Sequence, residues 1–402
     1  MRHEYIRAEQ FCDSVRDGTH DTPKQTENGH KLVTGKHIKN GQIDATDAYC
    51  ISEADYQKIN ERSLVEQWDV LMSMIGTVGE VAVVRDIPNY AIKNVALFKC
   101  GGSELKGKWL SYYLQSPIAK GQMNGNQKGS SQQFLSLRQL RDLPVLVTDE
   151  TLMHSIVDTL SAYDDLIENN QKQIKLLEEA AQRLYKEWFV DLRFPGYEDT
   201  PIVDGVPEGW EKDRADEFFE ITIGKTPPRA EKQWFTSGDK GIPWLSISDM
   251  GNAGVYALCT SEGLTEEAVK KHNMKVVPVG TIFVSFKLTV GRVAIANADM
   301  CTNEAIAHFY VKDDIYRAYT YCYLRNFEYD TLGNTSSISK AVNSKIIKAM
   351  PFVMPDRETI SSFSYVVSPI LAEINNKQRA CMRLQESRDR LLPKLMSGEI
   401  EV

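Results

Sequence analysis

The amino-acid sequence repeats itself once along its length, and this duplication limits the possible folds more than any other feature. The segment GTVGEVAV at 76–83 is similar to LTVGRVAI at 288–295, 212 residues farther along the chain. Later matches are 207 residues apart and pair Leu140 with Ile347, Pro144 with Pro351 and Ile167 with Ile374. A repeat of about 200 residues is much longer than a solenoid repeat, so the sequence predicts two copies of one domain.

Each repeat begins with a segment in which short apolar runs alternate with Gly, Asn and Ser. Branched aliphatic and aromatic runs of this length, bounded by turn residues, are typical of β-strands. We therefore expect a compact α/β module at residues 1–150 (module 1) and a second one at residues 213–355 (module 2). The runs are VAVV at 81–84, VALF at 95–98, TIFVSF at 281–286 and VAIA at 293–296.

The second part of each repeat has the apolar spacing of one long helix. Through most of residues 151–192 and 356–396, apolar residues recur every three or four positions. Because this is the spacing of a coiled-coil seam, we expect one long helix in each of these segments. Residues 193–212 are rich in Pro and Gly and are expected to form a linker, and residues 397–402 a short tail.

The charges of the two helical segments indicate how they pair. Residues 151–170 carry a net charge of −4, whereas residues 377–395 carry +4. Antiparallel pairing places these two segments side by side, and parallel pairing does not. It also brings Asn170 and Lys377 to the same level. The residues expected to pair the helices are Asn170, Ile174, Leu177, Ile374, Lys377 and Leu384.

These features predict a mixed α/β fold in which two duplicated α/β modules are separated by two long antiparallel coiled-coil helices. The composition is that of globular domains, since 42% of the 402 residues are hydrophobic and 25% are charged. No apolar run is long enough for a transmembrane helix, and the first residues lack the apolar core of a secretory leader. The seven cysteines are scattered, so we expect reduced thiols and a cytoplasmic protein.

The sequence offers little support for catalysis. Gly224, Lys225 and Thr226 lack the other glycine of a phosphate-binding loop, because Phe219 stands in its place. The seven histidines show no metal-ligand spacing, and no Ser, His and Asp can be assigned to a triad. We therefore expect no catalytic residue, no metal site and no cofactor bound by this chain.

Two polar loops give the main indication of nucleic-acid binding. The segment GQMNGNQKGSSQQ at 121–133 corresponds to TLGNTSSISK at 331–340, and each precedes a short helical pattern. Asn and Gln side chains can bond the edges of bases, while Ser, Lys and backbone N–H groups suit phosphates. The net charge is −8, so any contact with DNA depends on local basic patches or on basic partners.

Candidate DNA-binding residues lie in these loops and at basic positions elsewhere in each module. Taken singly, each basic residue is more often a solvated surface charge. In module 1 the candidates are Lys24, Gln25, Lys36, Lys39, Lys128, Ser130, Ser131, Gln132 and Gln133. In module 2 they are Lys225, Arg229, Lys287, Arg292, Ser336, Ser337 and Lys340.

Longer segments resemble those of a known family, the specificity (DNA-recognition) subunits of type I restriction-modification systems. The segment GKTPPRAEKQWFTSGDKGIPWLSISDM at 224–250 is similar to the family's Gly-x-Thr-Pro followed by an Ile-Pro-Trp strand. The resemblance covers essentially the whole chain, although the opening of module 1 at 2–23 departs from the usual pattern. The other matching segments are RLYKEWFVDLRFPGYE at 183–198, VDGVPEGW at 203–210 and LLPKLMSGEI at 391–400.

The resemblance implies that each module is a target recognition domain that reads one half of a split DNA sequence. It implies that the helices dock two methyltransferase subunits and that this chain catalyses nothing. S-adenosylmethionine would then be bound by the methyltransferase subunits, which methylate adenine. Restriction (motor) subunits would use ATP and Mg for translocation and cleavage. The family pattern gives no base-contacting residue by position, so the candidates above rest on the loops.

Two alternatives remain open from the sequence. One is a DNA methyltransferase with its own recognition domain, which the missing S-adenosylmethionine-binding and catalytic motifs disfavour. The other is a coiled-coil scaffold with no role in DNA binding. Salt-dependent binding of DNA by the purified complex would distinguish a scaffold from a specificity subunit, because phosphate contacts release counterions.

Overall fold

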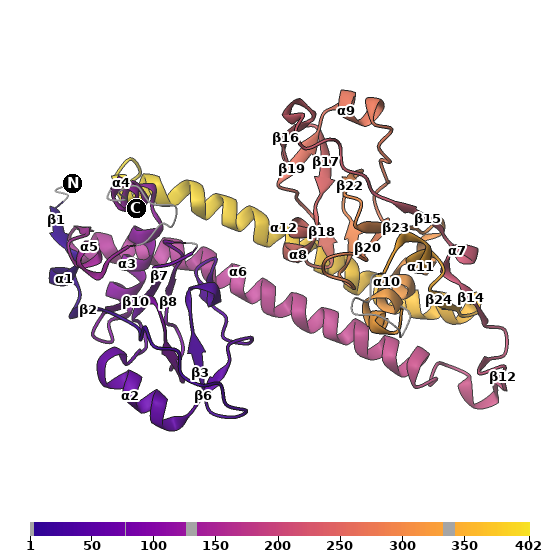
Figure 1. Ribbon diagram of the computed structural model, residues 1–402, viewed down its shortest axis with the longest axis horizontal. Helices are drawn as coiled ribbons and strands as arrows, with labels where there is room; N and C mark the ends of the chain where they lie inside the picture. The colour runs from indigo at the N-terminus through magenta and orange to yellow at the C-terminus, as the bar shows by residue number, and fades with distance from the viewer. Residues whose placement is uncertain (1–3, 77, 126–134, 333–341) are drawn as a thin grey trace. The chain divides into compact units, whose positions relative to one another are not determined.

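The contacts within the computed structural model divide the chain into two units, and Figure 1 traces their elements. Unit 1 contains Met1–Leu166 and Leu384–Val402, and unit 2 contains Ile167–Arg383. Module 1 therefore belongs to unit 1 and module 2 to unit 2, and each long helix contributes one part to each unit. The residues that the structure describes are 4–76, 78–125, 135–332 and 342–402.

A four-stranded antiparallel sheet with the order β2-β10-β7-β8 forms the centre of module 1. Val70 and Met72 point into one core cluster with Trp109 of α3 (Glu104–Gln115), whereas Leu71 belongs to a cluster on the opposite face. Because both faces are covered, three of the strands are mostly apolar in sequence, whereas the edge strand β2 has the sequence Ser-Val-Arg-Asp. The strands are β2 (Ser14–Asp17), β7 (Val70–Ser73), β8 (Val81–Val83) and β10 (Val95–Lys99).

Module 1 also contains a smaller sheet with the order β6-β3-β9. The first strand of the module, β1, pairs with its last strand, β11. The remaining strands are β1 (Glu4–Arg7), β3 (His30–Val33), β4 (Ile38–Lys39), β5 (Gln42–Ile43), β6 (Cys50–Ile51), β9 (Tyr90–Ile92) and β11 (Pro144–Val147). The remaining helices are α1 (Ala8–Phe11), η1 (Gly35–His37), α2 (Glu53–Ser63), α4 (Pro117–Gly125) and α5 (Leu137–Arg141).

Module 2 contains a five-stranded sheet with the order β15-β23-β20-β21-β18 and a four-stranded sheet with the order β16-β19-β17-β22. Its strands are β14 (Glu211–Arg214), β15 (Glu220–Ile223), β16 (Phe235–Ser237), β17 (Ile242–Leu245), β18 (Tyr256–Ala257), β19 (Glu262–Leu264), β20 (Ile282–Ser285), β21 (Val293–Ala296), β22 (Cys301–Thr302), β23 (Ile306–Tyr310) and β24 (Pro351–Met354). Its helices are α7 (Ala215–Phe218), η4 (Lys232–Trp234), α8 (Ile247–Asn252), α9 (Glu266–Lys271), η5 (Asp314–Tyr316), α10 (Arg317–Asn326), η6 (Tyr329–Thr331) and α11 (Ser344–Lys348).

The two modules follow the same order of elements. In each, a first strand (β1 or β14) leads through a four-residue helix (α1 or α7) to an edge strand (β2 or β15). The last strand (β11 or β24) returns to pair with the first. The hairpin β7–β8 with its neighbour β10 corresponds to β20–β21 with β23. The predicted duplication and the predicted mixed α/β fold are confirmed, and the divergent opening of module 1 forms the same elements as that of module 2.

In unit 1, the start of α6 (Glu150–Tyr185) packs against the end of α12 (Arg357–Ser397). Ile156 shares a core cluster with Leu395 and Met396, and farther along α6 the carboxylate of Asp164 accepts a 2.6 Å hydrogen bond from Arg388. Since the contacts on α12 move towards its start as those on α6 move towards its end, the two helices are antiparallel. The predicted direction of pairing is therefore confirmed in this unit.

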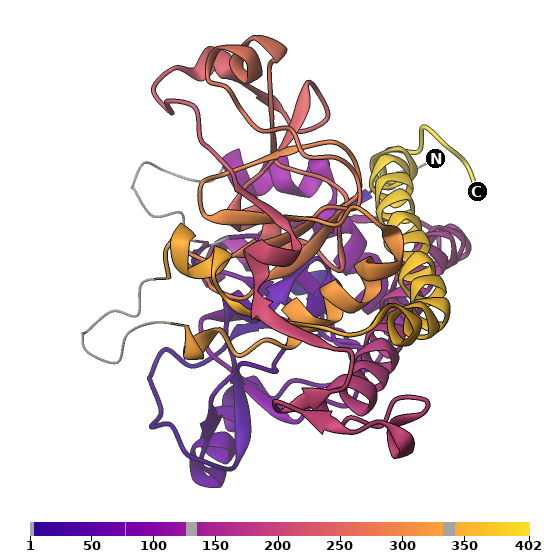
Figure 2. The ribbon, with the colours of Figure 1, turned by 90° about the vertical axis from the view of Figure 1, so that its right-hand side faces the viewer.

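In unit 2, the remaining part of α6 packs against the start of α12, and Figures 1 and 2 both show these parts side by side. A π-helical turn (Lys186–Val190) continues α6 and supplies Trp188 and Phe189. Their rings lie 5.8 and 4.9 Å from the ring of Phe363 on α12. This aromatic cluster closes the core of unit 2 where α6 ends and α12 begins.

The predicted seam residues lie along these contacts. Ile174 and Leu177 pack, half-buried, against the cluster of unit 2 that buries Ile374. In the same unit, the thiol of Cys381 lies 3.7 Å from the carbonyl oxygen of Ile167. That contact places Asn170 and Lys377 at nearly the same level, although Lys377 forms its 3.1 Å ion pair with Glu373 of its own helix. In unit 1, Leu384 of α12 is half-buried.

The segment between the long helices is not entirely irregular. It contains a short 3-10 turn (Tyr197–Asp199) and the two-stranded hairpin β12 (Ile202–Val203) and β13 (Val206–Pro207). The sheet of module 2 also begins at Glu211, slightly before the predicted module boundary. No helix within the described ranges is long and apolar enough to cross a membrane. No three His, Cys, Asp or Glu side chains within those ranges cluster as metal ligands.

Candidate nucleic-acid interface

The two polar loops chosen from the sequence connect equivalent elements of the two modules. The first begins within α4, which extends to Gly125, and ends before α5; the second begins at the last residue of η6 and ends before α11. The predicted short helix after each loop is confirmed, whereas the prediction of a loop at 121–125 is wrong, because these residues continue the helix. Eight of the candidate residues lie outside the described residues, so their contacts stay predictions. They are Lys128, Ser130, Ser131, Gln132, Gln133, Ser336, Ser337 and Lys340.

The other candidates of module 1 are exposed and lie between β2 and β5. Lys24 and Gln25 occupy the irregular segment before β3, and Lys39 lies in β4. The ammonium group of Lys36 is 3.2 Å from the carboxylate of Asp47. These side chains can meet a ligand in solution, but the structure does not gather them into one site.

In module 2, both candidate arginines are engaged within the fold. The guanidinium of Arg229 lies 4.5 and 4.6 Å from the ring centroids of Phe235 and Trp244, and it donates hydrogen bonds to both carboxylate oxygens of Glu262. Arg292 donates a 2.9 Å hydrogen bond to the carbonyl oxygen of Ile247. Both arginines therefore stabilise module 2 whether or not a ligand is bound.

The candidate lysines of module 2 differ from each other. Lys225 donates a 2.6 Å hydrogen bond to the carbonyl oxygen of His272. Lys287 is exposed in the turn between β20 and β21, with its ammonium group 5.5 Å from the ring centre of Phe286. Its charge acts on the carboxylate of Glu304 and helps to lower the pKa of that group.

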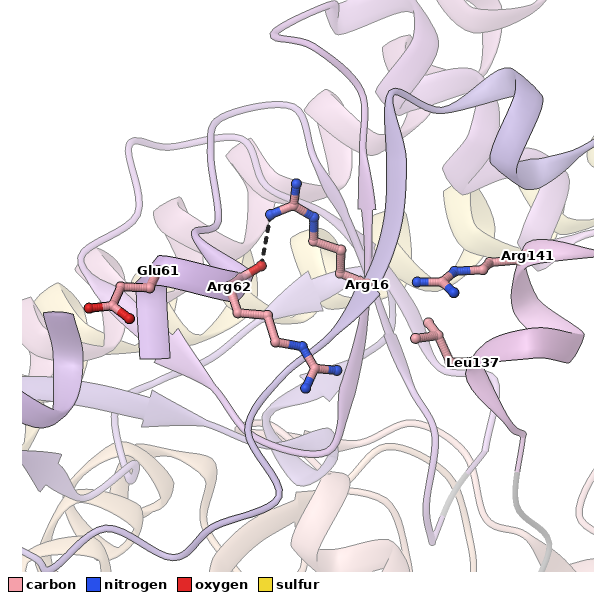
Figure 3. Close-up of a pocket in the computed structure, with 5 residues that line it drawn as sticks. All are labelled: Arg16, Glu61, Arg62, Leu137 and Arg141. Carbon is pink, nitrogen blue, oxygen red and sulfur yellow. Dashed lines mark hydrogen bonds between the residues drawn. The ribbon is translucent and has the colours of Figure 1, made fainter. Parts of the chain in front are cut away.

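A basic pocket in module 1 was not found from the sequence (Figure 3). Its volume is about 380 Å³, and it is lined by Arg16 of β2, Glu61 and Arg62 of α2, and Leu137 and Arg141 of α5. We call it the arginine pocket. Its residues come from three elements that are far apart in the chain, so no local motif marks it. The one available signal is that Leu137 and Arg141 directly follow the polar loop of 121–133.

Each arginine of the pocket is held by one contact within unit 1. Arg16 donates a 2.8 Å hydrogen bond to the carbonyl oxygen of Arg62, and Arg141 donates a 3.1 Å hydrogen bond to that of Val15. Arg62 is paired with the buried carboxylate of Asp17. An arginine carries five N–H donors, so each guanidinium keeps most of them available to a ligand.

The corresponding place in module 2 has a different chemistry. In module 1, Arg16 lies opposite Leu97 in the sheet, and in module 2 Thr222 lies opposite His308 at the equivalent register. His308 is buried, and its ring nitrogens lie 2.9 and 2.7 Å from the hydroxyl oxygens of Thr222 and Thr302. Burial lowers the pKa of His308 to about 4, so its imidazole is neutral at physiological pH.

The hydrogen bonds around His308 also fix its tautomer. The hydroxyl of Thr302 donates to the carbonyl oxygen of Asn303, so it accepts from Nε2–H of His308. Nδ1 then accepts from the hydroxyl of Thr222. Module 1 therefore has an exposed, cationic Arg16 at this position. Module 2 has Thr222 there, in a neutral hydrogen-bond network with His308 and Thr302.

Comparison with known proteins identifies the family. Residues 207–378 match the family model described as the type I restriction modification DNA specificity domain. This match makes residues 207–378 a type I restriction-modification DNA specificity domain, and the chain as a whole is similar to the specificity subunits of these systems. It is 26% identical over 368 residues to the type I restriction enzyme MjaIX specificity subunit of Methanocaldococcus jannaschii, covering 83% of this chain and 78% of that protein.

Two further relatives agree with this assignment. The type I restriction enzyme HindI specificity subunit of Haemophilus influenzae is 25% identical over 323 residues, which cover 64% of this chain and 69% of that protein. The crystal structure of the type I restriction-modification S subunit from M. genitalium covers 98% of this chain and 96% of that chain. Its TM-score is 0.56 at 14% identity, so the two chains share a fold.

Proposed function

We propose that this chain is a type I specificity subunit that reads a bipartite DNA site, with one half-site contacted by each module. The observation that carries the proposal is a fold whose central elements occur twice in the same order, with different side chains at equivalent surface positions. Arg16 and Thr222 occupy the same place in the two modules and differ in charge. Two modules with one backbone frame and different surfaces suit two different half-sites, because sequence is read by side chains at the base edges.

The chain itself would supply recognition, while the chemistry would reside in partner subunits in the cytoplasm. Two methyltransferase subunits that use S-adenosylmethionine would dock on the helices, and restriction subunits that use ATP and Mg would join them. Within unit 2, two large apolar side chains on the helices support a docking role. Leu176 of α6 is 64% exposed and Tyr365 of α12 is 85% exposed. Exposed apolar groups on long helices are typical of protein interfaces.

The proposed function is tested by sequencing methylated adenines in cells with and without this gene. We expect one bipartite motif, two short half-sites with a fixed gap, to lose methylation when the gene is deleted and to regain it when the gene is restored. Methylation that is identical in both strains would contradict the proposal. Salt-independent binding of DNA by the purified complex would instead favour the scaffold, since phosphate contacts make binding salt-dependent.

The proposed stoichiometry is tested by native mass measurement of the complex with its methyltransferase partner. Two copies of the partner per chain are expected, and Tyr365→Ala combined with Leu176→Glu should weaken the binding of one copy. The matched control is Lys175→Ala, a change at an exposed polar neighbour on α6. A stable complex with one copy at saturating partner would contradict the stoichiometry.

A further inference from the structure

We propose that the arginine pocket of module 1 binds one phosphate group of the DNA backbone beside the half-site that this module reads. The inference rests on the proposed function, since it names the part of the DNA that one described site contacts. Phosphate contacts fix the register of a protein on the duplex but carry no base information. The pocket would therefore position module 1 without changing which sequence it reads.

The charge of the pocket fits an anion. Three guanidinium groups line it, and the carboxylate of Asp17 compensates only that of Arg62. The one acidic lining residue, Glu61, directs its carboxylate away from Arg16 and Arg141 in Figure 3. The chain as a whole carries a charge of −8 and repels DNA at long range. A local concentration of positive charge is what such a chain needs in order to hold a phosphate.

The chemistry of the lining favours a phosphate over an organic small molecule. Pockets for small molecules are mostly lined by apolar and aromatic side chains, whereas Leu137 is the single apolar residue of this lining. Guanidinium groups match the geometry of phosphate oxygens and can bond them in pairs. Each guanidinium is already anchored by one hydrogen bond or ion pair, so a ligand need not immobilise a free side chain.

The position of the pocket favours the DNA backbone as the source of the phosphate. Arg16 is exposed, so a large ligand can approach it from outside the fold. Leu137 and Arg141 belong to α5, which begins directly after the polar loop of 121–133. That loop was selected from the sequence as a base-reading segment, on grounds that do not involve the pocket.

The experiment compares Arg16→Ala with the wild-type chain, in complex with the methyltransferase partner. Arg16 is chosen because it bonds a backbone carbonyl oxygen, whereas removing Arg62 would take the guanidinium partner away from the buried carboxylate of Asp17. Lys58→Ala is the matched control, because Lys58 is exposed one turn before Arg62 on the same helix. Equal thermal unfolding midpoints for the three proteins exclude a folding defect.

We expect Arg16→Ala to bind the target duplex about tenfold more weakly at moderate salt. The slope of the logarithm of affinity against the logarithm of salt should fall by about one, as for the loss of one phosphate contact. The methylated sequence should be unchanged, and Lys58→Ala should leave both affinity and slope close to wild type. A wild-type slope for Arg16→Ala, or equal effects of Arg16→Ala and Lys58→Ala, would overturn the proposal.

Duplexes with a single neutral methylphosphonate locate the phosphate. The wild-type complex should bind more weakly when the methylphosphonate replaces a phosphate at one or two positions beside the half-site of module 1. The Arg16→Ala complex should bind these duplexes as well as it binds the unmodified duplex. If the variant keeps the full loss at every position, the pocket does not contact the backbone. Saturation by inorganic phosphate that leaves DNA affinity unchanged would assign the pocket to a free anion, and would equally overturn the proposal. In either case sequence-specific methylation would continue, so failure of this inference differs from failure of the proposed function.

Discussion

The two modules share one order of elements but differ in what they place at equivalent positions. At the edge of the main sheet, module 1 has the exposed Arg16 and module 2 has Thr222 bound to a neutral, buried His308. Three central strands and one edge strand correspond in the two sheets, and the central strands are mostly apolar because both of their faces are covered. The difference shows that the frame tolerates a change of charge at its edge, which is where two recognition modules need to differ.

The ends of the long helices show a second difference between the units. Positions 185, 188 and 189 hold Tyr, Trp and Phe in unit 2, and the equivalent positions 392, 395 and 396 hold Leu, Leu and Met in unit 1. The partner position is Phe363 in unit 2 and Ile156 in unit 1. The same contact is thus made by aromatic rings in one unit and by aliphatic chains in the other.

The largest expected effect comes from removing the buried side chain at this partner position. Phe363→Ala should destabilise unit 2 by about 4 kcal/mol, and Ile156→Ala should destabilise unit 1 by about 3 kcal/mol, since both leave cavities in closed cores. Hydrogen exchange read by mass spectrometry assigns the loss of protection to one unit. Loss of protection in the other unit alone would contradict the equivalence of the two contacts.

The next effect concerns the polar network between α6 and its neighbours in unit 1. Asp164 accepts 2.6 Å hydrogen bonds from Arg388 and from the hydroxyl of Tyr112, whose pKa is raised by burial and by this carboxylate. Asp164→Ala leaves these donors without their carboxylate, so we expect a loss of about 3 kcal/mol in chemical denaturation. The control, Asp165→Ala, removes an exposed partner of Arg85 and should cost less than about 1 kcal/mol.

A pH effect is expected in module 2 and not at the equivalent position of module 1, which has Leu97. Between the ordinary pKa of 6.5 and the native value of about 4, the unfolded chain binds a proton at His308 that the folded chain does not. Stability therefore falls as the pH drops through this window, by up to about 3 kcal/mol. Thermal unfolding of wild type and His308→Gln at several pH values measures it. Equal pH dependence of the two proteins would contradict a neutral, buried His308.

The smallest expected effect lies in the turn formed by the repeated motif. Gly76 follows β7 with a φ of 80°, and its counterpart Leu288 follows β20 with a φ of 64° and is 88% exposed. The left-handed backbone conformation costs a leucine roughly 1–2 kcal/mol of folding free energy. A glycine avoids this cost, but it loses roughly 0.5–1 kcal/mol more backbone entropy on folding. Leu288→Gly should therefore raise stability by about 0.5 kcal/mol, whereas Gly76→Ala should lower it. A destabilised Leu288→Gly variant would mean that the leucine packs against something.

The sequence predicted the fold further than it predicted the site. Duplication, the strand runs and the antiparallel helices follow from repeated segments, apolar spacing and net charge, which can be read along the sequence without knowing which side chains meet in the fold. The arginine pocket depends on Arg16, Arg62 and Arg141, which only the folded sheet edge brings together. Arg229 and Arg292 were selected for their charge, but their charge is used within module 2 because aromatic rings and a carbonyl group lie beside them. The polar loops themselves still rest on the sequence alone.

The most direct test of one module for each half-site is to replace module 1, residues 1–150, with the module of a relative that has another target. Methylated adenines are then sequenced in cells that contain the exchanged chain and its methyltransferase partner. The account predicts that one half of the bipartite motif changes to that of the relative, while the other half and the gap remain. A change in both halves, or in neither, with the exchanged chain folded and bound to its partner, would contradict it.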